Sequence, residues 1–190
     1  MRVLIVAEGV HEREGALPTL VKRINAKLVC ECDNANTSRL RSLHRKGGGF
    51  EKRALRWLIR AEKKGYDAVV FLIDRDRNPD RVKQIDKAQE DKSQSELPRA
   101  LGVAIESFDA WMLADETALS QALRMTVSKQ KDPETLRNPK AICENLRDEA
   151  DTQQALRAMY DAVAAYVNLE VLKKRCPRGF EPFAKRVEAL

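Results

Sequence analysis

Long apolar runs are missing from this sequence, and their absence sets its broad class. No hydrophobic segment approaches the roughly 20 residues that a membrane-spanning helix needs. The chain begins directly with a short apolar run, without the pattern of a signal or transit peptide, so we expect a cytoplasmic protein with no membrane partner. Internal repeats and low-complexity tracts are also absent, and 190 residues suit one ordinary domain.

Cysteine is scarce as well, with only four residues in the chain. Cys30 and Cys32 lie close together while Cys143 and Cys176 stand alone, so the spacing matches neither a zinc site nor a dense disulfide framework. Cys30 and Cys32 would share one face of a strand, where we expect buried free thiols. This cysteine usage fits a reducing cytoplasm.

Charge is plentiful, and slightly more of it is positive. Charged residues make up 34% of the chain, which suits a soluble surface, and the net charge of +6 favours a polyanionic partner such as nucleic acid. Basic residues flank three consecutive glycines: Arg41, Arg45 and Lys46 precede them, and Lys52 and Arg53 follow. We predict that these five residues contact phosphates from a mobile loop; the alternative is an ordinary solvated loop.

Four short apolar runs are typical of buried strands. They lie at residues 2–7, 27–32, 68–73 and 101–105. Segments of helical periodicity separate them, among them residues 11–26 and 50–64, and this alternation predicts a mainly parallel four-stranded sheet flanked by helices, an α/β fold. The rest of the chain is helical in pattern. We therefore predict a single domain over residues 1–190, with an α/β core at 1–115 and a helical C-terminal extension, or cap, at 116–190.

Acidic residues follow three of the predicted strands. Glu8 comes directly after the first, beside Gly9; Asp74 and Asp76 come after the third; and Asp109 follows the fourth. Parallel strands bring their carboxyl ends to one edge of the sheet, so these carboxylates are expected to converge there. Clustered carboxylates in a crevice suit a hard divalent cation such as Mg²⁺ or Mn²⁺. The pattern therefore favours a metal-dependent enzyme.

Each acid also has a simpler explanation. Glu8 and Glu12 lie one helical turn apart and could be helix-start acids that the helix dipole favours. Asp74 and Asp76 could form ion pairs with nearby arginines, although two such carboxylates without a cation would repel each other. The metal hypothesis ranks above ion pairing because acids recur at the ends of separate strands.

In their order along the chain, these motifs resemble those of a known family. The Glu-Gly pair at residues 8–9 and the Asp-Arg-Asp triplet at 74–76 resemble the Toprim domain of topoisomerases, primases and nucleases. The Glu-Gly-Val-His-Glu stretch at 8–12 is similar to OLD-type nucleases and to small standalone Toprim proteins, as are the segment 107–115 and the Pro-Lys pair at 139–140. The resemblance covers most of the chain and implies a Toprim/Rossmann-like fold.

The resemblance also implies two cation sites and a catalytic lysine. One cation would be held by Glu8 and Asp74, and a second by Glu12, Asp76, Ser107 and Asp109. Lys140 would stabilise charge near the scissile phosphate, and Glu8 would link the metal to the general base, a role for which Glu12 is the alternative. Two cations about 3.5–4 Å apart can activate a water and stabilise the leaving oxygen of a phosphodiester.

Together these features predict a divalent-metal-dependent endonuclease that hydrolyses DNA or RNA. Small Toprim nucleases similar to this chain often act beside a separate ATPase in defence against phage or plasmids. Because this chain has no P-loop pattern, such an ATPase would be another polypeptide.

The sequence departs from the family pattern at two positions. Asp109 stands where glutamate is more usual, and Asn78 stands where topoisomerases carry a third aspartate. The alternative is a non-catalytic Toprim scaffold that binds a metal or nucleotide as an interaction or sensor protein. Assembly into a homo-oligomer stays an open prediction.

Overall fold

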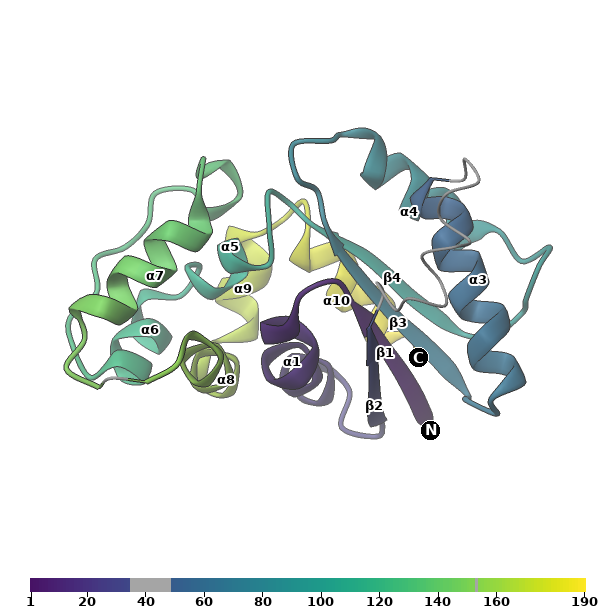
Figure 1. The fold of residues 1–190 in the computed structure, drawn as a ribbon, viewed down its shortest axis with the longest axis horizontal. Helices are drawn as coiled ribbons and strands as arrows, with labels where there is room; N and C mark the ends of the chain where they lie inside the picture. The colour runs from purple at the N-terminus through teal and green to yellow at the C-terminus, as the bar shows by residue number, and fades with distance from the viewer. Residues whose placement is uncertain (35–48, 153) are drawn as a thin grey trace.

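The structure is a computed structural model that describes residues 1–34, 49–152 and 154–190. Within them the chain forms a four-stranded, all-parallel sheet with helices on both faces, an α/β Rossmann-like fold (Figure 1). The strands are β1 (Arg2–Ala7), β2 (Val29–Asn34), β3 (Ala68–Asp74) and β4 (Arg99–Ala104), in the order β2-β1-β3-β4. The predicted fold class is confirmed.

The strand register places the acid-bearing turns at one edge of the sheet. Ala7 of β1 lies opposite Leu72 of β3, and Asp74 of β3 lies opposite Ala104 of β4. The carboxyl ends of these three strands therefore meet, and the residues that follow them share a rim.

Alternating side chains along the strands feed two apolar cores, one on each face of the sheet. On one face, Leu4 and Phe71 pack in the same cluster as Trp57 of α3 (Phe50–Lys63) and the apolar residues of α4 (Asp80–Glu90). These two helices cover that face in Figure 1. Both helices begin beside the strand ends, so their first turns lie at the rim that follows β1 and β3.

On the other face, Val70 and Leu72 belong to a larger core. It includes buried residues of α1 (Leu17–Ile24), α8 (Leu156–Tyr166) and α10 (Phe180–Glu188). The C-terminal helices are therefore continuous with the sheet through one hydrophobic cluster.

The helix predicted at residues 11–26 is built in two parts. A π-helical turn, η1 (Glu12–Ala16), runs straight into α1. Pro18 in the first turn of α1 has no N–H to donate, which removes one α-type hydrogen bond at that point. Gly15 of η1 lies so close to α8 that an added Cβ would come within 1.7 Å of Asp161 Oδ1. The beginning of this helix is thus set against the C-terminal helices.

The region beyond β4 is helical, as predicted. It contains α5 (Asp109–Met112), α6 (Glu116–Leu123), the 3-10 turn η2 (Pro133–Thr135), α7 (Pro139–Glu149), α8, α9 (Leu169–Arg175) and α10. The sequence pattern did not predict α9. The last helix packs on β4, where a Cβ at Gly102 would lie 2.6 Å from the ring of Phe183. A division of the chain into a core and a cap after residue 115 stays a prediction.

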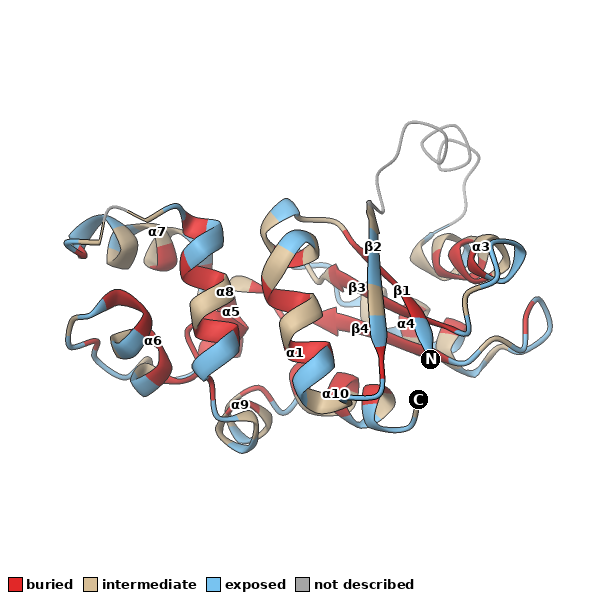
Figure 2. Ribbon diagram, turned by 90° about the horizontal axis from the view of Figure 1, so that it is seen from below, coloured by how far each residue is buried: buried red, intermediate tan, exposed pale blue. Residues whose placement is uncertain are grey.

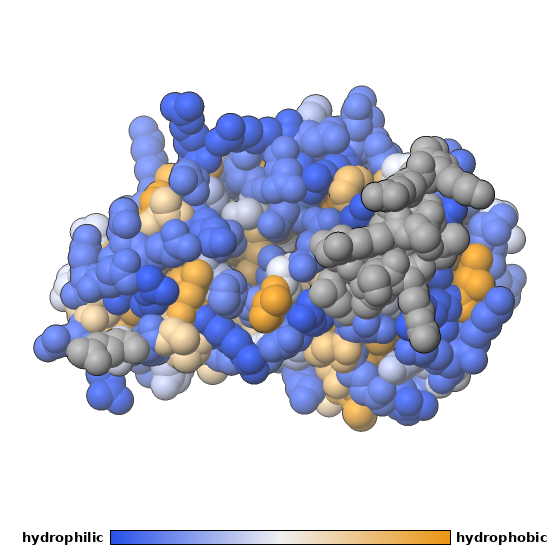
Figure 3. Space-filling model, in the orientation of Figure 1, coloured by the Kyte–Doolittle hydropathy of each residue, from blue (hydrophilic) through white to orange (hydrophobic). Residues whose placement is uncertain are grey.

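Burial follows this layering, since buried residues line the sheet and the inner sides of the helices (Figure 2). The face seen in Figure 3 is mostly hydrophilic. No helix of the described residues has the length and apolar character to span a membrane. All four cysteines are free; Cys143 and Cys176 are buried, Cys30 is half-buried and Cys32 is exposed. The expected burial of Cys32 is wrong, because β2 is the outer strand of the described sheet.

Candidate active site

Five predicted acids gather at the carboxyl edge of the sheet. Glu8 directly follows β1, and Glu12 begins η1; Asp74 is the last residue of β3, and Asp76 lies two residues beyond it; Asp109 begins α5 after β4. Electrostatic coupling among them is strong enough that Glu8, Asp74 and Asp109 all raise the pKa of Glu12. The structure therefore brings these residues to one rim from distant parts of the sequence.

Two of the five carboxylates are neutralised by arginines. Glu8 accepts a hydrogen bond from Arg53 at 2.9 Å and lies 3.8 Å from Arg81. Arg81 also donates to Asp76 at 2.7 Å and to the backbone carbonyl of Asp74 at 2.6 Å. Ion pairing, the simpler explanation given for Asp74 and Asp76, thus accounts for Asp76. Glu8, whose simpler explanation was a helix-start acid, is paired with arginines as well.

The two arginines share an aromatic neighbour. The ring of Phe50 lies 4.3 Å from the guanidinium carbon of Arg53 and 4.4 Å from that of Arg81. Such cation–π contacts hold a guanidinium in a preferred orientation. Gln84 of α4 accepts a hydrogen bond from the Phe50 amide at 2.6 Å, which ties the start of α3 to α4. The guanidinium groups of Arg53 and Arg81 are therefore held in place where they contact Glu8.

Glu12, Asp74 and Asp109 have no arginine or lysine partner within the described residues. Neutral donors hold them instead. The Gly9 amide donates to Glu12 at 3.3 Å, and the Phe108 amide donates to Asp74 at 2.8 Å. We call these three residues, which have no cationic partner in the described part of the chain, the uncompensated acids.

Asp109 is oriented from two sides, by Ser107 and by Tyr160. Ser107 Oγ donates to Asp109 Oδ2 at 2.8 Å, and the hydroxyl of Tyr160 donates to Oδ1. Tyr160 belongs to α8 and is almost fully buried. The ring of His11 meets that of Tyr160 edge-on, with 6.0 Å between centroids. No local sequence motif marks Tyr160 as part of the site.

Burial and mutual repulsion raise the pKa values of Glu12 and Asp74. Burial raises the pKa of Asp74 to about 7, and the neighbouring Asp109, Asp76 and Glu8 add to this against the Phe108 hydrogen bond. The pKa of Glu12 is raised well above its usual value by burial and then by Asp74. Both carboxyls therefore hold a proton more tightly than usual, and a bound cation would compete with that proton.

A pocket of about 350 Å³ opens onto this cluster. It is lined by Asp74, Asp76, Arg77, Glu106, Ser107, Asp109, Arg137, Asn138, Pro139 and Lys140. The acids of this lining, and Arg77, belong to the turns that follow β3 and β4, whereas Arg137 and Lys140 belong to the start of α7 and the segment before it. The structure thus places the predicted lysine in the same pocket as three of the predicted acids, Asp74, Asp76 and Asp109.

The backbone around this pocket adopts a sparsely populated conformation. Asp76, Arg77 and Glu106 have φ angles of 46°, 59° and 61°, and only Arg124 shares this property among the described non-glycine residues. An ion pair between Arg75 and Glu106 joins the turn after β3 to the turn after β4. Left-handed backbone at non-glycine residues is unfavourable by roughly 1–3 kcal/mol each and concentrates at functional sites.

Gly9 serves the site through its small size. A Cβ at this position would lie 2.5 Å from Glu12 Oε1, so only glycine lets the Glu12 carboxylate rest against the backbone that follows β1. This close approach also allows the hydrogen bond from the Gly9 amide.

The predicted phosphate-contacting loop is only partly described. Arg41, Arg45 and Lys46 lie outside the described residues. Lys52 is exposed on α3, in a pocket away from the acids. Arg53 faces the acids and pairs with Glu8, so its charge is directed at the rim rather than at solvent.

The oxygen donors at this rim match a hard divalent cation in kind but not in arrangement. As the side chains lie, no group of three or more His, Cys, Asp or Glu residues in the described part of the chain is arranged to hold a metal ion. The available donors are carboxylates and the Ser107 hydroxyl, which is the all-oxygen chemistry that Mg²⁺ and Mn²⁺ prefer. Only the chemical type of the donors, and not their geometry, therefore suits such a cation.

Comparisons with known proteins gave a simple result. The chain matched no protein-family model, no curated protein and no solved structure. The Toprim resemblance and the roles that it implies stay predictions, so the function is argued from the site.

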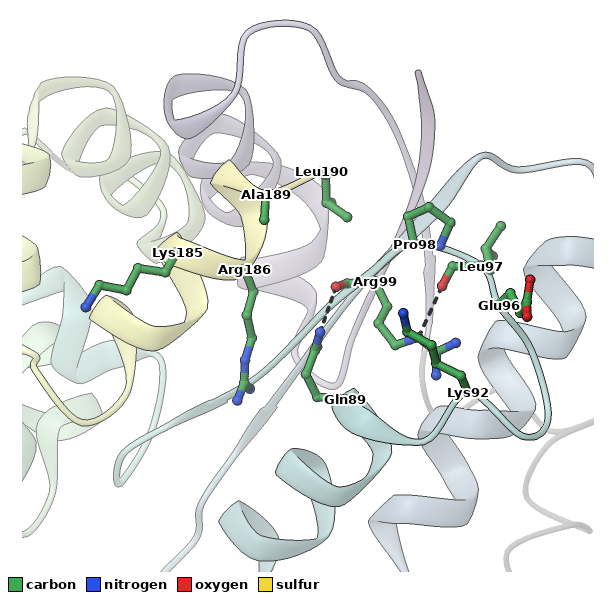
Figure 4. Close-up of a pocket in the computed structure, with 10 residues that line it drawn as sticks. All are labelled: Gln89, Lys92, Glu96, Leu97, Pro98, Arg99, Lys185, Arg186, Ala189 and Leu190. Carbon is green, nitrogen blue, oxygen red and sulfur yellow. Dashed lines mark hydrogen bonds between the residues drawn. The ribbon is translucent and has the colours of Figure 1, made fainter.

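A second pocket, of about 470 Å³, lies at the opposite edge of the sheet, where β4 begins (Figure 4). Its most buried charge is Arg99, which is 7% exposed. The guanidinium donates to the backbone carbonyls of Ala88, Asp91, Ser95 and Leu97. Arg99 thus holds the segment between α4 and β4 in place, which is a structural role.

Proposed function

We propose that this protein is a divalent-metal-dependent nuclease that hydrolyses phosphodiester bonds of DNA or RNA. The observation that carries the proposal is the set of uncompensated acids: Asp74 and Asp109 line one pocket together with Lys140, and Glu12 is buried beside them. Carboxylates that repel one another destabilise a fold, and a bound cation removes that repulsion. A positive side chain in the same pocket suits a negatively charged substrate.

The uncompensated acids would be the first to hold Mg²⁺ or Mn²⁺. Bound cations of this kind activate a water and neutralise the charge of the phosphate. Asp76 and Glu8 would contribute to a second cation once Arg81 and Arg53 turn away, and Ser107 keeps Asp109 directed at the site. Lys140 would neutralise the charge that builds on the phosphate during attack. Glu8 is the candidate general base. Its Oε2 lies 3.8 Å from Arg81 Nη1, too far for a hydrogen bond, so this oxygen is available to accept a proton.

The test measures cleavage and metal binding on the same protein. Purified protein is incubated with plasmid, single-stranded DNA and transfer RNA in Mn²⁺, Mg²⁺ or EDTA, and Mn²⁺ binding is measured by electron paramagnetic resonance. Asp74→Asn and Asp109→Asn are expected to lose at least about 100-fold in cleavage rate, because each removes a cation ligand. Asp148→Asn, an exposed acid on α7, is the matched control and is expected to cleave normally.

Two results would contradict the proposal. One is the absence of both Mn²⁺ binding and cleavage in the unaltered protein. The other is equal cleavage by the unaltered protein and by Asp74→Asn, which would point to a contaminating nuclease.

A non-catalytic scaffold is the second candidate, and the arginine pairs favour it. Arg53 and Arg81 already neutralise Glu8 and Asp76, as would be expected of a protein that binds no second cation. Mn²⁺ binding without cleavage of any substrate would support this candidate. From the resemblance we also propose that the protein is cytoplasmic and acts with an ATPase on a separate polypeptide. Co-purification of an ATPase with this protein from the native host would test that partner.

A further inference from the structure

We infer that Arg77, Arg137 and Lys140 form a wall that binds consecutive phosphates of a polynucleotide strand. We call these three residues the basic wall. The inference deepens the proposed function and rests on it for the position of the scissile phosphate. The basic wall would supply substrate contacts inside the pocket, in addition to those predicted for the basic glycine-containing loop.

The described acids balance the charges of the basic wall only weakly. Arg77 and Arg137 are exposed and have no carboxylate partner among the described residues. Lys140 Nζ lies 4.0 Å from Glu144, which is the outer limit of an ion pair. By contrast, Arg75 and Arg81 at the same rim are both closely paired with acids. Cations without a close acidic partner therefore line the same pocket as Asp74 and Asp109.

The fold brings the basic wall together from two separate segments. Arg77 lies in the left-handed turn that follows β3, and its Nη2 donates to the backbone carbonyl of Arg137 at 3.3 Å. Arg137 and Lys140 flank the start of α7, where Asn138 accepts a hydrogen bond from the Ala141 amide at 3.3 Å. That cap fixes the backbone between Arg137 and Lys140. The three cations are thus held on a defined surface.

The number of cations indicates the class of substrate. A phosphodiester carries one negative charge, so Arg77, Arg137 and the weakly paired Lys140 together exceed what a single phosphate would need. The acids of the same pocket repel phosphates, which confines a strand to the basic wall except where a bound cation joins a phosphate to the acids. A strand that runs along the basic wall would place one phosphate at Lys140 and neighbouring phosphates at Arg137 and Arg77. A mononucleotide would fill only part of this surface.

Salt-dependent binding tests the inference directly. Fluorescence anisotropy measures the affinity of the full chain for labelled single-stranded DNA and RNA of the same sequence, in EDTA, over a series of KCl concentrations. Each phosphate contact contributes about 0.7 to the slope of log affinity against log salt for a single strand. Arg137→Ala and Arg77→Ala are each expected to lower that slope by about this amount and to weaken binding of both nucleic acids several-fold.

The control is Arg147→Ala, which removes the same charge from the far end of α7, where Arg147 pairs with Asp148. It is expected to leave the slope nearly unchanged. Unchanged slopes and affinities in both Arg137→Ala and Arg77→Ala would overturn the inference. So would a mononucleotide that competes as strongly as an oligonucleotide of equal phosphate concentration.

The two proposals fail in distinguishable ways. If the protein binds Mn²⁺ and cleaves nucleic acid while the basic-wall variants bind and cleave normally, only the inference is wrong. The other case is a smaller salt-dependence slope in the variants, together with an unaltered protein that neither binds Mn²⁺ nor cleaves nucleic acid. In that case the basic wall binds nucleic acid and the nuclease proposal is wrong.

Discussion

At the scale of single residues, Asp109 shows how the C-terminal helices take part in the site. Tyr160 on α8 lies 51 positions away in the sequence and donates a hydrogen bond to Oδ1. Cys143 on α7 adds a weaker contact, with its Sγ 3.7 Å from the Asp109 carbonyl. Because a buried donor fixes the direction of a carboxylate, the orientation of this acid depends on packing that lies outside its own motif.

Removal of the Tyr160 hydroxyl is expected to weaken cation binding with little change in fold. Tyr160→Phe keeps the buried ring but leaves the Asp109 carboxylate with the Ser107 hydrogen bond alone to orient it. Loss of such an orienting hydrogen bond typically reduces metal affinity by about 10–100-fold. Mn²⁺ binding followed by electron paramagnetic resonance measures the change, and the midpoint of urea denaturation reports on the fold.

Tyr166→Phe is the matched control, since Tyr166 lies on the same helix and is 49% exposed. It is expected to bind Mn²⁺ as the unaltered protein does. Equal Mn²⁺ affinity in Tyr160→Phe and in the control would show that Asp109 does not need this hydrogen bond.

At the scale of secondary structure, α3 and α4 supply the counter-charges of the rim. Their first turns carry Arg53 and Arg81, with Phe50 packed between the two guanidinium groups. Arg81 alone joins α4 to Asp76, to the Asp74 carbonyl and to the neighbourhood of Glu8. The two helices therefore stabilise the turns after β1 and β3 through the same residues that a second cation would displace.

Arg81→Ala is expected to destabilise the protein in EDTA more than in Mn²⁺. The variant loses hydrogen bonds to a carboxylate and to a carbonyl, a loss of about 1–3 kcal/mol in the free energy of unfolding. A bound cation would take over part of the role of Arg81 near Asp76, so saturating Mn²⁺ is expected to reduce that loss. Urea denaturation in the two buffers gives both values.

Lys185→Ala serves as the comparison, because Lys185 pairs with Glu181 at an exposed position on α10 and lines the pocket at the opposite edge of the sheet. Its effect is expected to stay within about 0.5 kcal/mol in either buffer. An equal loss for Arg81→Ala with and without Mn²⁺ would show that the cation and Arg81 do not share the same acids.

At the scale of the whole molecule, the acid rim links global stability to pH. Asp74 binds its proton more tightly in the folded protein, where its pKa is about 7, than in the unfolded chain, where it is 3.8. Between these two values the folded state carries a proton that the unfolded state has released. The free energy of unfolding of the metal-free protein therefore falls as pH rises from about 4 to about 7, and this contribution is constant above that range.

Asp74→Asn is expected to remove this pH dependence. The variant and the unaltered protein should have similar stability below about pH 3, where Asp74 is neutral in both states. Near pH 7 the variant is expected to be more stable in EDTA by up to about 4 kcal/mol, because it has no charge to bury. Thermal denaturation across this pH range measures the difference.

Asp148→Asn, an exposed acid on α7, is the control and is expected to follow the unaltered protein at every pH. Added Mn²⁺ is expected to reverse the order near pH 7, since it stabilises only the protein that keeps the carboxylate. A constant difference between Asp74→Asn and the unaltered protein from pH 4 to pH 7 would contradict the assigned titration.

Most of the acids at the rim could be predicted because the sequence patterns that mark them are local. Apolar runs with strand periodicity marked β1, β3 and β4, and Glu8, Asp74 and Asp109 follow them in the sequence. Parallel topology then requires such residues to meet at one edge. The π-helical turn before α1 was not predicted, because the apolar spacing of residues 11–26 is the same for one continuous helix.

The sequence by itself therefore determined the α/β class and the convergence of the acids, since both follow from periodicity and the direction of parallel strands. Only the tertiary structure decided which acids are neutralised. Arg81 and Arg53 pair with Asp76 and Glu8, while the uncompensated acids receive only neutral donors. The physical reason is distance along the chain: a hydrogen bond such as that from Tyr160 to Asp109 joins residues that no local pattern relates, so only packing selects it.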